Sequence, residues 1–148
     1  MLEIEKDRKT KTAVICPVIK TAAGMMTAEE EAARENEAVG LVLAMGQEVV
    51  FCETVRMSAI VPKSFFGKGT LERLKTACEE KGAELLVVDM PVSAVQQRNL
   101  EKMLNMKVID RTAVILEIFG QRAQTREGKL QVELAHLTYQ RGRLVRSW

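Results

Sequence analysis

Hydrophobic and polar positions follow two different periods along the chain, and this predicts strands and helices in alternation. Four short runs of mainly β-branched and leucine residues predict buried strands: Thr12–Ile19, Gln47–Val55, Ala83–Met90 and Lys107–Asp110. Four stretches of helical character follow them and predict helices: Ala28–Met45, Leu71–Lys81, Ser93–Asn105 and Thr112–Ala123. The alternation favours an α/β fold, with a small, mainly parallel sheet flanked by helices. Pro17, inside the first run, indicates an edge position or an early strand end.

Local signals indicate where several helices begin and end. Thr27-Ala-Glu-Glu30 and Ser93-Ala-Val-Gln96 are capping boxes, in which a hydroxyl and a side chain three residues later satisfy two backbone amides. Glycines stand at two expected helix stops, positions 46 and 82. Thr70 is the expected N-cap of the second helix, which should bury Leu71, Leu74 and Cys78 on one face. The segment before it, Arg56–Gly69, reads as a long loop.

The last segment, Glu127–Trp148, predicts a helix of about 33 Å at 1.5 Å per residue. Apolar residues recur on it at heptad spacing and define a leucine seam: Leu130, Leu134, Leu137, Leu144 and Trp148. Such a stripe requires a partner, so one hypothesis is that the seam pairs with a second copy to form a homodimer. The expected organisation is a flexible tail (1–11), an α/β domain (12–111) and a helical segment (112–148).

Composition adds a charge asymmetry to this picture. The chain has 148 residues and a net charge of +2, yet residues 98–148 hold ten Lys or Arg against five Asp or Glu. Arginine side chains bind phosphate groups well. Two interpretations of these basic residues are therefore equally favoured: contact with RNA, and a solvated helix face without a partner. The candidate contacts are Arg122, Arg126, Lys129, Arg141, Arg143 and Arg146. Three widely spaced cysteines, no apolar run long enough for a membrane span and no secretory signal predict a cytoplasmic protein with reduced thiols.

Candidate catalytic chemistry is sparse. No GxxxxGK[ST] motif occurs. Weak candidates for an anion site are Gly67, Gly69 and Thr70, in a turn before a predicted helix. A tight turn without a bound anion is the favoured interpretation of these residues. Asp89 and Asp110 follow predicted strands and are expected to cap turns, with acid–base work as the alternative. His136 is expected to be a solvated helix residue. We therefore predict no catalytic residue, no metal site and no cofactor in this chain.

The C-terminal part of the chain, Pro91–Trp148, resembles the HflX family of ribosome-associated GTPases. The matching motifs are Gln96-Gln-Arg-Asn-Leu-Glu101, Val108-Ile-Asp-Arg-Thr112, Ile115-Leu-Glu-Ile-Phe119 and Thr125-Arg-Glu-Gly-Lys-Leu-Gln-Val-Glu-Leu-Ala135. The likeness thins over Glu37–Met90, and Cys52–Ser64 is atypical. Thr70 also departs from the family, which usually has Lys there.

The resemblance implies an N-terminal α/β domain, a long two-helix hairpin and then a GTPase domain. It implies binding to the large ribosomal subunit and its rRNA, and the splitting of stalled or idle ribosomes. The family's GTP- and Mg²⁺-binding motifs map onto no residue here, and the chain ends within the first hairpin helix. The expected function is therefore a ribosome-binding and regulatory module that acts with its own GTPase domain and hydrolyses no GTP itself. The alternatives are an independent nucleotide- or anion-binding domain using Gly67–Thr70, and a self-associating helical module.

Overall fold

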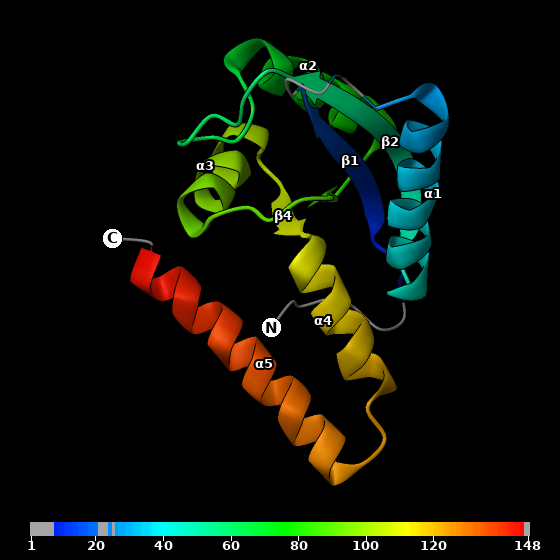
Figure 1. The fold of residues 1–148 in the computed structure, drawn as a ribbon, viewed down its shortest axis with the longest axis vertical. Helices are drawn as coiled ribbons and strands as arrows, with labels where there is room; N and C mark the ends of the chain where they lie inside the picture. The colour runs from blue at the N-terminus through cyan, green and yellow to red at the C-terminus, as the bar shows by residue number, and fades with distance from the viewer. Residues whose placement is uncertain (1–7, 21–23, 25, 147–148) are drawn as a thin grey trace.

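Four parallel strands form one sheet in the computed structural model, which describes residues 8–20, 24 and 26–146. The strands are β1 (Lys11–Ile19), β2 (Glu48–Met57), β3 (Leu85–Val88) and β4 (Lys107–Asp110). Their order across the sheet is β2-β1-β3-β4, and every pair is parallel (Figure 1). The predicted α/β fold with a parallel sheet is confirmed.

Five helices complete the fold: α1 (Ala28–Ala44), α2 (Lys68–Lys81), α3 (Ala94–Leu104), α4 (Arg111–Arg122) and α5 (Arg126–Arg146). Successive residues of β1 point to opposite faces, and both faces are apolar. Ala13 and Ile15 pack with α2 and α3, whereas Val14 and Cys16 pack with α1 and α4. The strands read as continuous apolar runs because helices cover the sheet on both sides.

The predicted helix signals act as expected at three sites. Thr27 and Ser93 each form a complete capping box, in which the hydroxyl accepts from the backbone N–H three residues on at 3.1 Å. Gly82 takes the left-handed conformation, at φ 70°, that ends α2. These ends depend on a few adjacent residues, so the sequence alone locates them.

Pro17 lies neither in an edge strand nor at an early strand end, so both predictions are wrong: β1 lies in the middle of the sheet and continues to Ile19. β3 pairs with β1 only as far as Ile15, whereas β2 runs beside β1 to its end at Ile19. Pro17 therefore has a neighbouring strand on one side only, where its missing N–H removes no ladder bond from β3. The proline marks a local edge within a central strand.

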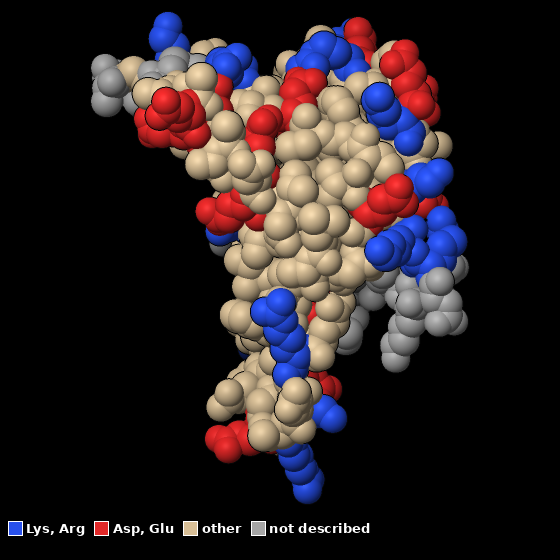
Figure 2. Space-filling view, turned by 90° about the vertical axis from the view of Figure 1, so that its right-hand side faces the viewer, with Lys and Arg blue, Asp and Glu red and all other residues tan. Residues whose placement is uncertain are grey.

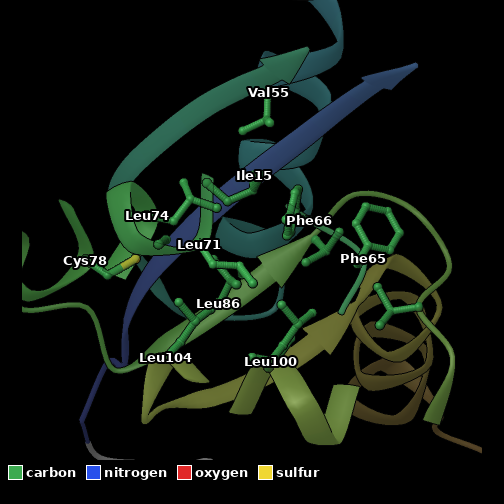
Figure 3. Packing of buried hydrophobic residues seen from close by; sticks show 14 residues of the cluster. Ile15, Val55, Phe65, Phe66, Leu71, Leu74, Cys78, Leu86, Leu100 and Leu104 are labelled. Carbon is green, nitrogen blue, oxygen red and sulfur yellow. The ribbon is translucent and has the colours of Figure 1, made fainter. Parts of the chain in front are cut away.

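The segment before α2 supplies core residues in addition to connecting β2 to α2. Phe65 and Phe66 are completely buried, with ring centroids 4.9 Å apart in an edge-to-face arrangement (Figure 3). Phe65 has φ 68°, a left-handed conformation that costs energy for a bulky residue and is compensated here by its burial. The N-cap of α2 is Gly67, so the prediction of Thr70 as N-cap is wrong.

Residues assigned to the flexible tail also contact the body. The Arg8 guanidinium donates two hydrogen bonds to the Glu84 carboxylate, at 2.9 and 2.8 Å. The Thr10 backbone N–H donates to Gln47, and Lys11 already belongs to β1. Hydrogen bonding from Arg8, followed by that from the Lys11 backbone, lowers the pKa of Glu84 to about 2. The ordered body therefore extends at least to Arg8.

Candidate nucleic-acid interface

Basic side chains occupy the turn between α4 and α5, the lower tip of the molecule in Figure 1. α4 ends at Arg122, and α5 begins at Arg126. Thr125 organises the start of α5, since its hydroxyl accepts from the Gly128 N–H and its carbonyl from the Lys129 N–H, both at 2.9 Å. Arg122, Arg126 and Lys129 are exposed and are called the basic turn below. Figure 2 shows Lys and Arg side chains projecting from this tip.

Within the part of the chain that the structure describes, the cations of the basic turn have no carboxylate partner, whereas five arginines elsewhere do. Ion pairs in the layer are Arg8–Glu84, Arg34–Asp89, Arg56–Glu31, Arg73–Glu53, Arg111–Glu37 and Arg111–Asp89. Over the described residues, no ion pair involves Arg122, Arg126, Lys129 or Arg141. Unpaired arginines present their full charge and hydrogen-bond donors to solvent, which suits binding of phosphate groups.

The remaining basic candidates lie toward the other end of α5. Arg141 is exposed and stands about 22 Å along the helix from Arg126, at 1.5 Å per residue. Arg143 and Arg146 belong to the same helix, but the structure does not describe their side chains. The structure thus separates the described candidates into the basic turn and the single Arg141, instead of gathering them in one patch.

The leucine seam points away from the α/β layer. Leu130, Leu134 and Leu137 are 56 %, 65 % and 56 % exposed. A stripe of apolar side chains of this size is normally covered by a partner. Leu144 and Trp148 fall outside the described side chains. This part of the seam is therefore open to a further helix or to a second chain.

His136 is buried against α4, so the prediction of a solvated histidine is wrong. Only 9 % of the residue is exposed, and a Cβ added at Gly120 would lie 3.9 Å from its Nε2 atom. His136 Nε2 and Glu117 Oε1 are buried without a hydrogen-bond partner among the described residues. The heptad spacing indicates that the leucines form the packing face of α5. In the structure, α5 packs on α4 through a different face, which includes Val132 and His136.

Asp110 confirms the capping hypothesis and also anchors α5. Its Oδ1 atom accepts from the Ala113 N–H at 3.1 Å, which makes it the N-cap of α4, and its Oδ2 atom accepts from the Val92 N–H at 3.0 Å. The Tyr139 hydroxyl donates to Oδ1 at 2.9 Å. Sequence reasoning missed Tyr139, and its position one turn after His136 is the signal that could have revealed it.

Asp89 lies between the carboxyl ends of β1 and β3, where the strand order reverses and open α/β sheets usually bind ligands. It accepts from Arg34 Nε at 3.2 Å and from Arg111 Nη1 at 2.9 Å. Arg34 also donates to the carbonyl oxygens of Pro17 and Asp89. Hydrogen bonds to Glu37 and to Asp89 raise the pKa of Arg111. Asp89 therefore anchors two arginines, and the prediction that it caps a turn is wrong.

Residues Gly67–Thr70 form the beginning of α2. Gly67 has φ −69° and caps α2 without a side-chain hydrogen bond, and Thr70 lies inside the helix. A Cβ at Gly67 or Gly69 would meet nothing within 4 Å, so neither glycine is needed for a close approach. The expected tight turn with Thr70 as N-cap is wrong, because these residues form the N-cap and first turn of α2.

The cysteines are free thiols. Burial raises the pKa of Cys78 to about 11, and a hydrogen bond from Cys16 lowers the pKa of Cys52. Across the residues that the structure describes, no three His, Cys, Asp or Glu side chains are grouped as a metal site would require. None of the described helices has the length and apolar character to cross a membrane.

Comparisons with known proteins identify the family. The model described as "GTP-binding GTPase N-terminal" matches residues 32–120, more than half of the chain, and "GTP-binding GTPase Middle Region" matches residues 122–148. The chain belongs to the HflX family of GTPases. Its similar relatives include the GTPase HflX of Magnetococcus marinus, 50 % identical over 113 residues, and that of Escherichia coli, 44 % identical over 113 residues. Each alignment covers 76 % of this chain and 26 % of the relative.

The chain spans about a quarter to two-fifths of the length of the HflX relatives it matches. The GTPase HflX of Treponema denticola, 38 % identical, aligns with 96 % of this chain and 40 % of its own length. A crystal structure of a GTP-binding protein from Sulfolobus solfataricus, in complex with GDP, matches with a TM-score of 0.62 and 22 % identity. That match covers 88 % of this chain and 36 % of the archaeal chain, and it shows that the two share this fold.

Proposed function

We propose that this chain is the ribosome-binding and regulatory N-terminal part of an HflX GTPase, with the basic turn and Arg141 contacting rRNA of the large subunit. The observation that carries the proposal is the contrast in pairing. Five arginines of the α/β layer and its edge are paired with carboxylates, whereas Arg122, Arg126, Lys129 and Arg141 are exposed and form no ion pair with any described residue. The HflX relatives support a longer parent that binds and hydrolyses GTP.

In this proposal, GTP hydrolysis belongs to the rest of the parent, together with the sites for GTP and Mg²⁺. The sequence offers no phosphate-binding loop, and the Arg34–Asp89–Arg111 network fills the usual ligand position at the strand ends. Residues 1–148 would bind the ribosome, and α5, as the first helix of a hairpin, would link this contact to the GTPase domain. The protein would act in the cytoplasm, where ribosomes are found.

The test is salt-dependent co-sedimentation of the chain with purified large ribosomal subunits. Replacing Arg122, Arg126 and Lys129 together with Gln should weaken binding and lower the slope of log affinity against log salt by about 2 to 3, since each phosphate contact contributes about 0.7–0.9. The matched control replaces three exposed α2 lysines with Gln: Lys68, Lys75 and Lys81. Equal losses in the two variants, or no binding by the wild-type chain at low salt, would overturn the proposal.

Self-association through the leucine seam is a second candidate, favoured by the exposure of Leu130, Leu134 and Leu137. It predicts a dimer mass by light scattering at micromolar concentrations, and reversion to a monomer when Leu134 becomes Glu. A monomer mass for the wild-type chain removes this candidate. The two candidates are separable because the basic turn and the seam share no residue.

A further inference from the structure

A groove opens between α4 and α5 directly beside the basic turn. It has a volume of about 400 Å³, within the range of small-molecule binding pockets, and its walls are mostly apolar. The lining includes Leu116, Phe119 and Arg122 from the end of α4, and Gln131 and Val132 from α5. Phe119 is 56 % exposed, so much of a large aromatic residue is in contact with solvent. The residues named here belong neither to the leucine seam nor to the two clusters of the hydrophobic core, although some of their neighbours along the helices do.

We propose that the α4–α5 groove holds an unpaired RNA base stacked on Phe119, with Arg122 on the adjoining phosphate. This proposal rests on the proposed function and adds to it the kind of RNA that the domain selects. Bases that have left a helix stack on aromatic rings or on guanidinium planes, whereas bases within A-form duplexes are inaccessible to such a pocket.

The chemistry of the lining suits a nucleotide. Phe119 offers an exposed aromatic ring, and Arg122 in the same groove has no ion-pair partner among the described residues. Gln131 brings an amide donor and an amide acceptor, which match the edge of a base. Arg126 and Lys129, on the first turn of α5, lie at the same tip for neighbouring phosphates. An apolar protein segment would use the aliphatic walls but leave these charges unmatched.

The groove also stays available when a helix covers the leucine seam. Adjacent helix positions are about 100° apart, so Val132 and Ala135, which line the groove, lie about 100° or more around α5 from Leu130 and Leu134. Gln131 lies about 60° from Leu134, at the boundary between the groove and the seam. The greater part of the groove is therefore outside the surface that a partner helix on the seam would cover.

The experiment is fluorescence anisotropy of the 148-residue chain with a labelled ten-nucleotide single-stranded RNA and with a duplex of the same sequence. We expect tighter binding of the single strand. Phe119→Leu should weaken that binding at least about fivefold without altering the salt slope, since base stacking on an aromatic ring is not a charge effect. Phe119→Tyr should retain the affinity, and Arg122→Gln should lower the slope by about 0.7. Leu43→Ala, at an equally exposed position on α1, should change nothing.

Ultraviolet cross-linking followed by mass spectrometry of the peptides locates the base, and attachment within residues 116–135 supports the groove. The proposal is overturned if Phe119→Leu binds single strands as the wild type does, if duplex is bound equally well, or if the cross-link lies elsewhere. A mass doubling that Phe119→Leu abolishes, with RNA binding unchanged, would assign the groove to a second copy. If large-subunit binding survives these failures, the proposed function stands without the base site; if neither RNA nor subunits bind, both fail.

Discussion

The buried Arg34–Asp89 pair offers the sharpest test of how the strand ends are held. In Asp89→Asn, the carboxylate that accepts from Arg34 and Arg111 loses its charge while both guanidinium groups remain. The Asp89 side chain is 3 % exposed and that of Arg34 is 21 % exposed, so solvent replaces little of the lost interaction. Arg111 is 36 % exposed and keeps Glu37 as a partner, so it should lose much less.

Breaking a buried pair by removing one partner costs about 3–5 kcal/mol. Because Arg34 retains two carbonyl acceptors, we expect the lower end of that range, about 3 kcal/mol, for Asp89→Asn. With a urea dependence of about 2–3 kcal/mol per M for a domain of this size, the unfolding midpoint should fall by about 1–1.5 M. Urea titration followed by far-UV circular dichroism measures it.

Glu53→Gln is the matched control, because Glu53 also pairs with an arginine but its partner Arg73 is 51 % exposed. Exposed pairs contribute about 0–1 kcal/mol, so the control should shift the midpoint by less than about 0.5 M. If Asp89→Asn loses no more than Glu53→Gln, burial does not determine the strength of this network and the reasoning is refuted.

Three further predictions concern other contacts. The pKa of Glu84 is lowered in the folded state from 4.5 to about 2. Its pair with Arg8 therefore stabilises the fold above pH 4.5, and this stabilisation is lost as the pH falls toward 2. Unfolding titrations between these pH values should show a shallower pH dependence of the unfolding free energy for Glu84→Gln than for the wild type. Leu74→Ala, at a fully buried position on the core face of α2, should cost about 2–5 kcal/mol of unfolding free energy in urea, and a loss below about 1 kcal/mol would contradict the packing described. Tyr139→Phe removes the hydrogen bond to Asp110 and should lower the free energy of unfolding by about 0.5–1.5 kcal/mol. Amide hydrogen exchange in α5 should be faster in this variant than in the wild type. Unchanged exchange would show that this bond does not hold the helix.

Much of the local structure follows directly from the sequence. The capping boxes at Thr27 and Ser93 and the stop at Gly82 are short-range patterns, and the structure confirms each. The burial of Leu71, Leu74 and Cys78 is confirmed because helical periodicity identifies a core-facing stripe without knowledge of its partner. The loop at Phe65 and Phe66 was less predictable, since its burial depends on distant strands and helices.

The candidate interface was predicted only in part. The sequence identified Arg122, Arg126, Lys129 and Arg141 as basic residues, but the finding that no described carboxylate pairs with them depends on where those carboxylates lie in three dimensions. The groove at Phe119 was missed altogether. It forms where two helices diverge from a turn, and no spacing in either helix signals that geometry.

The sequence by itself determined the helix and strand content, several helix ends and the family, because these depend on periodicity, on neighbouring residues and on shared motifs. Tertiary structure alone decided that Pro17 stands in a central strand and that Asp89 fills the usual ligand position with two arginines. It also decided that α5 buries His136 and hydrogen-bonds Tyr139 to Asp110 while the leucines face outward. The physical reason is common to these cases: burial and ion pairing are properties of contacts between segments far apart in the chain, and a one-dimensional pattern does not specify which segments meet.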